Sequence, residues 1–227
     1  MTVSENIEWV HARIARACQK AGRAPEQVRI LPISKKQSPE LVRQAAECGL
    51  DVFGENRVQE AAQKIPLCPG HLSWHLVGHL QSNKVRAACG LFVAIHSVDS
   101  ERLLRRISEN AQEQGRVIEC YLEVNVSGEA SKFGLAPEQV PAVLAASHSL
   151  LGVDVIGLMT MPPLAPDPEQ TRPFFARLRE LRDRWREESG MPLHALSMGM
   201  SGDFEIAVEE GATCVRLGTV LFGRREA

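Results

Sequence analysis

The sequence has no long hydrophobic run, no excess of charge of either sign and no closely spaced pair of cysteines. No apolar stretch reaches the roughly 20 residues that a membrane-spanning helix requires, and the N-terminal segment lacks the apolar centre of a signal peptide. The 26 lysines and arginines nearly balance the 28 aspartates and glutamates. These absences argue against a membrane protein and against nucleic acid as the main partner, and they favour a cytoplasmic location.

The six cysteines are scattered, so we expect unpaired thiols and no metal cluster. His71, His75 and His79 are spaced by four residues, as zinc ligands on a helix would be. However, the residues around His75 have the pattern of a strand, in which positions four apart lie about 13 Å from one another. We therefore expect no metal site.

Short apolar runs rich in β-branched residues alternate with amphipathic patterns along the chain. The predicted strands are 29–35, 51–55, 73–78, 91–98, 118–126, 154–161, 195–199 and 214–222. The predicted helices are 4–21, 38–49, 100–115, 136–150, 167–190 and 201–211. Eight such strands in 227 residues predict a single α/β domain, residues 1–227, folded as a (β/α)8 TIM barrel.

An open, doubly wound sheet is the competing architecture, but no G-x-G-x-x-G motif follows the first strand. After the eighth predicted strand only "GRREA" remains, which is too short for a full eighth helix. We expect the extra N-terminal helix to cover the barrel surface that a full eighth helix would cover in a complete barrel. The proline-rich segment 161–170 is expected to be a stiff loop after strand six.

Reactive residues in such barrels lie at the C-terminal ends of the strands. Lys35 is the most informative of them, because strand alternation places it on the same face as Ile33 and opposite to Lys36. If that face points inward, burial lowers the pKa of the Lys35 ammonium, and its neutral amine can attack an aldehyde. The alternative is that both lysines are solvated loop residues. The residues at the predicted strand ends are Lys35, Lys36, Glu55, Asn56, 75–78, Asn125, Met159, 197–201 and 216–219.

Two further features indicate an anion site and a buried cation. Ser201 could cap the helix predicted at 201–211, with Gly202 allowing a phosphate close to the backbone, and Gly218 and Thr219 could add N–H donors. A plain helix cap is the alternative, and the acids that follow Gly202 favour it. Arg216 shares a strand face with Gly218 and requires an acceptor, which could be a carboxylate or a ring nitrogen.

Six ordered segments resemble the pyridoxal phosphate homeostasis protein family, which is related in fold to the N-terminal barrel of alanine racemase. The segments are "ISK", "FGENRVQEAAQK", "WHLVGHLQSNK", "VNVSGEASKFG", "GLMTM" and "LSMGMSGDFEIAVEEGATCVRLGTVLFG". Leu76 departs from the Phe or Met that is common in the third segment, which we expect to affect packing only.

The resemblance implies a barrel that binds pyridoxal 5'-phosphate (PLP) through a Schiff base, the covalent aldimine, on Lys35. It implies phosphate contacts from Ser201, Gly218 and Thr219, and Arg216 facing the pyridine nitrogen. Asn56, His75, Ser197 and Met200 would belong to the same pocket. The implied role is to carry or buffer PLP, and to hand it to PLP-dependent apo-enzymes, without established catalytic turnover.

The alternatives are a PLP-dependent amino-acid racemase or lyase, a cofactor-free Schiff-base aldolase and a scaffold protein. An arginine cannot lend the pyridine nitrogen a proton, which weakens the ring as an electron sink. A racemase also needs a second base, whereas this chain has no second domain and a single tyrosine, Tyr121, in the fifth strand. These features favour a carrier over an enzyme. We expect the protein to be a monomer or a weak dimer.

Overall fold

The computed structural model describes residues 2–129 and 132–223, and within them eight parallel strands form one sheet. The strands are β1 (Arg29–Pro32), β2 (Val52–Glu55), β3 (Ser73–Leu76), β4 (Ala94–Val98), β5 (Ile118–Glu123), β6 (Val153–Met159), β7 (Ala195–Ser197) and β8 (Cys214–Leu217). Each strand from β2 to β8 pairs with its neighbour in sequence, and β8 pairs with β1. Between β1 and β2 a single bridge joins Ile33 to Gly54. The predicted TIM barrel is confirmed.

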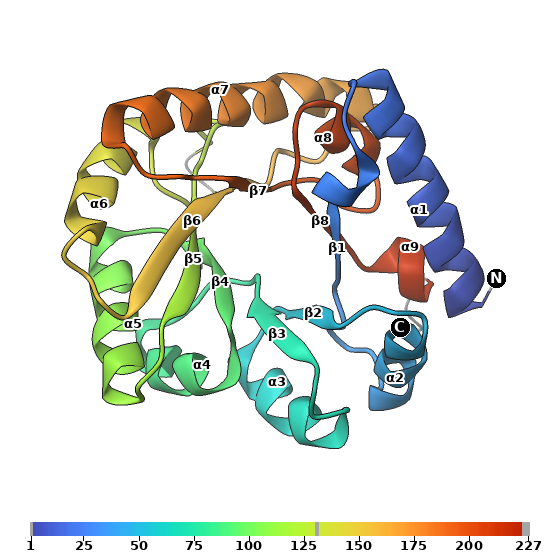
Figure 1. Ribbon diagram of the computed structural model, residues 1–227, viewed down its shortest axis with the longest axis horizontal. Coiled ribbons are helices and arrows are strands. Elements are labelled where there is room, and N and C mark those ends of the chain that lie inside the picture. The colour runs from blue at the N-terminus through green and yellow to red at the C-terminus, as the bar shows by residue number, and fades with distance from the viewer. Residues whose placement is uncertain (1, 130–131, 224–227) are drawn as a thin grey trace.

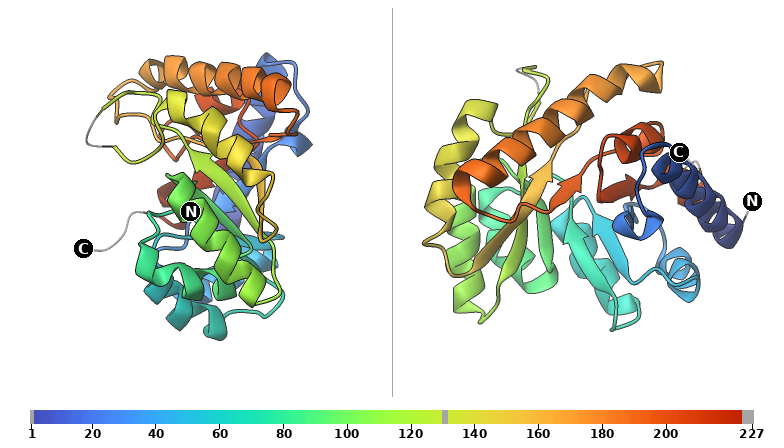
Figure 2. Two further views of the ribbon diagram at one scale, coloured as in Figure 1. Left: turned by 90° about the vertical axis from the view of Figure 1, so that its left-hand side faces the viewer. Right: turned by 45° about the horizontal axis from the view of Figure 1, so that its top comes forward.

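Helices surround the strands, as Figures 1 and 2 show. In the described ranges they are α1 (Val3–Lys20), α2 (Pro39–Glu47), α3 (Val58–Lys64), α4 (Val85–Leu91), α5 (Glu101–Glu113), α6 (Val140–Ser147), α7 (Arg172–Ser189), α8 (Phe204–Glu209) and α9 (Thr219–Phe222). Their ends follow local chemistry: Ser38 caps α2, Ser100 caps α5, and Gly190 ends α7 in the left-handed conformation.

Several predicted boundaries are wrong. The strand predicted at 214–222 ends at Leu217, and its last part is the one-turn helix α9, which the apolar "TVLF" does not distinguish from strand. The helix predicted to begin at Ser201 begins at Phe204, after three residues of turn. Helices α3 and α4 were not predicted, because seven residues each give too little periodicity to detect. Residues 224–227 of the C-terminal "GRREA" and residues 130–131 of the fourth family segment lie outside the described residues.

The N-terminal helix fills the position expected for it. α1 lies beside α2, α8 and the short α9 (Figure 1), and its apolar face, including Ile7, Val10 and Ile14, is buried. The Asn6 side-chain amide also donates to the carbonyl oxygen of Leu221 at 2.8 Å. The N-terminal helix therefore covers the barrel beside α9, which is a single turn within the described residues.

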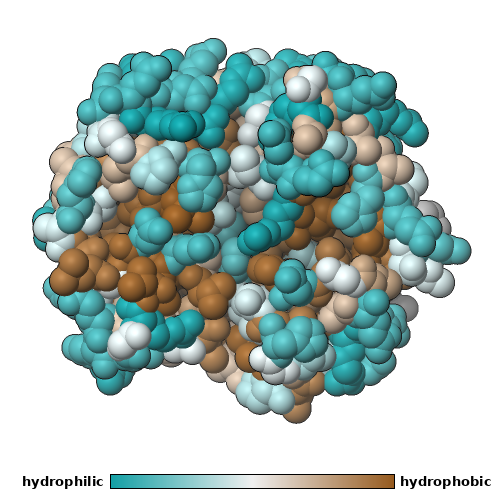
Figure 3. All heavy atoms as spheres, in the orientation of Figure 1, coloured by the Kyte–Doolittle hydropathy of each residue, from teal (hydrophilic) through white to brown (hydrophobic). Residues whose placement is uncertain are grey.

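The core has two layers. The larger layer lies between the strands and the helices, and smaller clusters inside the barrel include Leu31, Ile33 and Val52 on one side and Tyr121 and Ile156 on the other. In the face shown in Figure 3, hydrophilic residues cover the upper edge, over α7, and hydrophobic residues show in the middle. None of the described helices is both long and apolar enough to cross a lipid bilayer.

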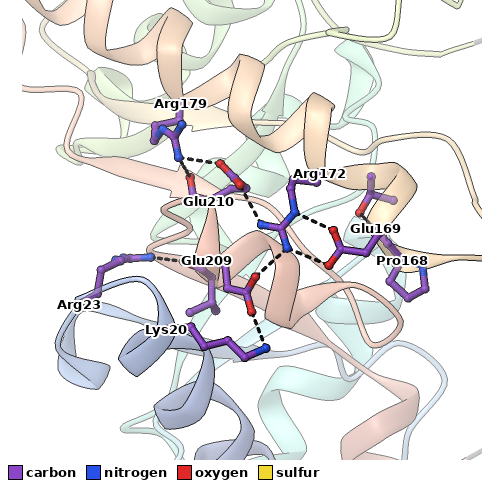
Figure 4. A network of polar contacts seen from close by, with 10 residues as sticks. Lys20, Arg23, Pro168, Glu169, Arg172, Arg179, Glu209 and Glu210 are labelled. Atoms are coloured by element: carbon purple, nitrogen blue, oxygen red, sulfur yellow. Dashed lines mark hydrogen bonds and ion pairs between the residues drawn. The ribbon is translucent and has the colours of Figure 1, made fainter.

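An ion network joins α1, α7, α8 and the 3₁₀ turn η5 (Pro168–Thr171), as Figure 4 shows. The Arg172 guanidinium donates to Glu169, Glu209 and Glu210 at 2.7–2.9 Å, and these hydrogen bonds raise its pKa. Lys20 of α1 also donates to Glu209, at 3.0 Å. The network holds η5, at the end of the loop after β6, against the C-terminal end of α8, and the loop after β6 borders the cavity described next.

Candidate functional site

A cavity of about 310 Å³ opens at the C-terminal ends of β1, β7 and β8, under the proline-rich loop after β6. Six of the nine residues predicted to bind the cofactor line it, namely Lys35, Met200, Ser201, Arg216, Gly218 and Thr219. Its other lining residues are Ile33, Pro162, Pro163, Leu164, Ala165, Pro168, Thr171, Gly202 and Asp203. The predicted loop at 161–170 is thus present and forms one wall of the cavity.

Lys35 lies on the cavity wall together with Ile33, as strand alternation predicts, and is half-buried. Its neighbour Lys36 is exposed and has a left-handed backbone, with φ of 59°. This conformation is uncommon for a residue other than glycine. It turns the chain away from the barrel directly after Lys35. The primary amine that borders the cavity is therefore that of Lys35 and not that of Lys36.

A buried ion cluster holds the backbone on both sides of Lys35. The Lys64 ammonium donates to the Ser34 carbonyl oxygen at 2.5 Å and to the Glu55 carboxylate at 2.6 Å. It also donates to Glu60 at 2.9 Å, and Glu60 in turn accepts the backbone N–H of Lys36. Burial raises the pKa of Glu55, which Lys64 opposes, and Oε2 of Glu55 has no partner among the described residues. The cluster holds the backbone of Ser34 and of Lys36, and it therefore also fixes the backbone of Lys35 between them.

The polar end of the cavity is built differently from the prediction. Ser201 does not cap α8, because Asp203 occupies the N-cap position and its carboxylate accepts the Met200 N–H at 2.7 Å. The Ser201 hydroxyl instead accepts the N–H of Val220, at 3.3 Å, which joins this loop to the start of α9. A Cβ placed on Gly202 would meet nothing within 4 Å, so the backbone there faces open space.

Arg216 is 5% exposed and lies at the base of the cavity. Its guanidinium donates to the carbonyl oxygen and hydroxyl of Ser197, at 2.6 and 2.8 Å, and to the carbonyl oxygen of Thr160 at 2.9 Å. Burial lowers its pKa, and the nearby Glu123 opposes that shift. Three of its five N–H groups are used in these bonds, which leaves two for a ligand in the cavity.

Ser197 and His75 do not line this cavity but lie below it inside the barrel. A ring nitrogen of His96 is 2.8 Å from the Ser197 hydroxyl, and its other nitrogen is 2.9 Å from Nδ1 of His75. Tyr121 stacks on His96 with ring centroids 4.0 Å apart. Burial lowers the pKa of His75 to about 4 and holds that of His96 well below its ordinary value of 6.5, so both rings are neutral at pH 7. The structure therefore connects Ser197 and His75 to Arg216 through a buried polar chain.

Asn56 lines a different cavity, with Gly78 and His79, so it does not share the wall that holds Lys35. Sequence reasoning missed Glu60, Lys64 and His96. The first two were within the family segment "FGENRVQEAAQK", which could have drawn attention to them. His96 lies in an otherwise apolar predicted strand, and a polar residue there was the available signal. No group of three or more potential metal ligands occurs among the described residues.

Comparison with known proteins agrees with the fold. Residues 7–226 match the family model "Alanine racemase, N-terminal domain". The pyridoxal phosphate homeostasis protein of Aquifex aeolicus is 45% identical over 227 residues, which is the whole of both chains. That of Pseudomonas aeruginosa is 44% identical and covers 99% of this chain and 96% of its own.

A solved structure also matches this chain over most of its length. PipY of Synechococcus elongatus, solved with PLP bound, is 37% identical, covers 93% of this chain and 100% of its own, and has a TM-score of 0.81. The chain is thus a barrel of the alanine racemase N-terminal class. Within that class it belongs to the family of pyridoxal phosphate homeostasis proteins.

Proposed function

We propose that the chain binds PLP in the cavity beside Lys35 and carries or buffers it. The observation that supports this best is the presence of one amine, one buried guanidinium and one open polar backbone segment on the walls of a single cavity. Its volume of about 310 Å³ is in the range of small-molecule sites. The donors present also fit the three polar parts of PLP, which are an aldehyde, a ring nitrogen and a phosphate.

Each part of PLP has a matching residue in this proposal. When bound, PLP supplies an aldehyde that condenses with a primary amine with loss of one water molecule, and Lys35 provides that amine. Arg216 directs its remaining N–H groups to the ring nitrogen. Ser201, Gly218 and Thr219, next to Met200, hold the phosphate. Ser197 and His75 support Arg216 from below, and Asn56 lies at the edge of the neighbouring cavity.

The residues around the cavity suit binding better than turnover. Arginine keeps its proton, so it leaves the ring nitrogen unprotonated. Tyr121 does not line the cavity, is stacked on His96, and has its pKa raised by burial, so it is poorly placed to act as a base. Asp203 is the one carboxylate on the described cavity wall, and it is engaged with Met200. An amino-acid racemase or lyase remains the alternative function.

Three further proposals concern the setting of the protein. PLP-dependent apo-enzymes are the proposed recipients, and the 93% exposed Leu164 on the cavity loop is compatible with such contacts. A cytoplasmic location is supported by the six cysteines, all of which lie in the described ranges and are unpaired. A monomer or weak dimer is proposed, because α1 covers the barrel surface that would otherwise be exposed.

An absorption spectrum tests the main proposal. Purified protein mixed with PLP should develop a visible band, and borohydride should abolish the band and fix PLP to one peptide, which mass mapping should place at Lys35. Lys35→Ala should abolish this fixation, whereas the matched control Lys36→Ala should keep it. No band in the parent protein, or fixation that persists in Lys35→Ala, would contradict the proposal. Release of the α-deuteron from labelled amino acids well above the rate with free PLP would favour the enzyme alternative.

A further inference from the structure

A second and larger cavity, of about 620 Å³, lies between the loops that follow β2 and β3. Its walls come from the start of α3 and from the 3₁₀ turn η3 (Ser82–Lys84). The lining residues are Asn56, Arg57, Val58, Gln59, Gly78, His79, Gln81 and Lys84. All but two of these have polar side chains, and the proposed function uses only Asn56.

The polar side chains of this cavity have few protein partners. In the described part of the chain, no hydrogen bond or ion pair involves the side chain of Arg57 or Lys84, or those of Asn56, Gln59 and Gln81. Elsewhere in the barrel, cations that border a cavity loop are paired, as Arg172 is with three carboxylates. Two cations and three amides therefore converge on one hollow with their hydrogen-bonding groups available.

The floor and one wall of the cavity are fixed by packing. A Cβ placed on Gly78 would lie 2.2 Å from the backbone oxygen of Asn56, so the two loops touch and only glycine fits between them. On the wall, Nδ1 of His79 is 3.3 Å from Oδ2 of Asp99, and the His79 ring stacks on Phe133 with centroids 4.3 Å apart. The hollow is thus formed before any ligand enters.

The acids nearest the two cations are engaged with other groups. Glu60 is close enough to Arg57 to interact with it electrostatically, but its carboxylate is already bonded to Lys64 and to the Lys36 N–H. Asp99 is engaged by His79. The residues that line the cavity include two cations, one planar guanidinium and one ammonium, and no carboxylate.

We propose that this cavity binds a small organic anion with two negative charges, either a dicarboxylate or a phosphate monoester. Arg57 presents the forked donor that suits a carboxylate or phosphate, and Lys84 supplies a second point charge. The amides of Gln59 and Gln81 can donate to the ligand's oxygens and accept from any hydroxyl or ammonium that it carries. The site is separate from the Lys35 cavity and does not depend on PLP binding.

Nuclear magnetic resonance titration tests the site in the intact protein. Succinate and glycerol 3-phosphate are the probes, which separate the two chemistries, and neutral succinamide is the control. Binding should shift the backbone amides of Gly78 and Gln81, while those of Gly202 and Gly218 report on the Lys35 cavity. Shifts confined to Gly202 and Gly218, or equal shifts with succinamide, would overturn the proposal, whether or not PLP binds.

Matched variants locate the charge that binds the probe. Arg57→Leu and Lys84→Met should each weaken binding about tenfold, because each removes one charge-assisted contact. Arg102→Leu on α5 is the control, since Arg102 is exposed, does not line the cavity and should leave affinity unchanged. PLP uptake should be unchanged in Lys84→Met. Equal affinities of the parent, Arg57→Leu and Lys84→Met proteins would refute the assignment.

Discussion

The ammonium of Lys64 lies 2.5 Å from the backbone carbonyl oxygen of Ser34, the residue directly before Lys35. Lys64 approaches this carbonyl from the helix layer, which the Ser34 side chain faces, whereas Lys35 faces the cavity. A buried cation on α3 therefore holds the backbone next to Lys35, whose amine is proposed to bind PLP. Lys64 is a positioning residue for Lys35 and does not itself line the cavity.

Lys64→Met should destabilise the fold by about 3–5 kcal/mol, because it leaves the buried Glu55 carboxylate unpaired. The double variant Lys64→Met with Glu55→Gln removes both charges and should recover most of that stability. PLP uptake, followed by the visible band, should nevertheless stay slower than in the parent, since Ser34 has lost its donor. Lys20→Met, which removes an exposed pair, is the control and should change neither quantity. Full recovery of uptake in the double variant would mean that Lys64 has a structural role only.

Glu123 should make the stability of the protein depend on pH. Burial raises the pKa of Glu123 to about 7, from 4.5, so between these values the folded chain keeps a proton that the unfolded chain has lost. The contribution of Glu123 to the free energy of unfolding should therefore fall as pH rises from 4.5 to 7, by about 3 kcal/mol. Denaturant titrations of the parent and of Glu123→Gln at each pH measure this difference.

His75 acts in the opposite direction over much of that range. Burial lowers its pKa to about 4 from 6.5, so its contribution to stability should rise with pH across that window. In the parent the two trends oppose each other, and in Glu123→Gln the rise from His75 should become visible. A parent and variant with parallel pH profiles would show that Glu123 is ionised normally.

The Arg172 network should contribute to stability in a salt-dependent way. Arg172→Met removes contacts with three carboxylates, each worth about 0.2–1 kcal/mol for a partly exposed pair, so a loss of about 1–2 kcal/mol is expected. The loss should shrink at high salt, because screening weakens the pairs in the parent. Melting temperatures at low and high salt measure both effects. Arg86→Met, which breaks one exposed pair, should change the melting temperature little.

Two glycines at the barrel mouth should respond differently to the same substitution. Gly78→Ala places a Cβ 2.2 Å from the Asn56 backbone oxygen, so the loops must separate, at a cost of about 1–3 kcal/mol. Gly202→Ala meets nothing within 4 Å and should leave the melting temperature unchanged. Its methyl group would nevertheless enter the open side of the Lys35 cavity, so PLP affinity should fall. Equal melting temperatures for both variants would contradict the close contact at Gly78.

Much of the fold was predictable because its signals are local. The eight strands are apolar runs bounded by polar turns, and caps such as Ser38 and Ser100 mark their helices within a few residues. That Lys35 shares a face with Ile33 follows from their spacing, and the structure places both on the cavity wall. Strand ends collect at one end of any parallel barrel, so six of the nine predicted cofactor residues could be brought to one cavity from the chain order.

The remaining features depend on partners that are distant in sequence. Lys64 lies 30 residues after Ser34, and no local pattern shows that its ammonium reaches that carbonyl. The chain from His75 through His96 to Ser197 joins three strands, and its last two members are 101 positions apart in the sequence. The position of Asn56 on a second cavity could not be predicted for the same reason, because chain order does not show how two neighbouring loops divide the space above the strands.

The junction between β1 and β2 has a consequence for how the amine could move. The structure joins these strands by the single bridge from Ile33 to Gly54, with the Ser34 N–H donating to the Gly54 oxygen at 2.9 Å, whereas six residues of β5 are paired with β6. The junction next to Lys35 is thus one of the two most weakly paired in the sheet, the other being that between β7 and β8, where one residue pair is in register. Local separation of β1 from β2 would move the Lys35 side chain while the other strand pairs stay intact. Release of PLP from Lys35 would then not require unfolding of the barrel.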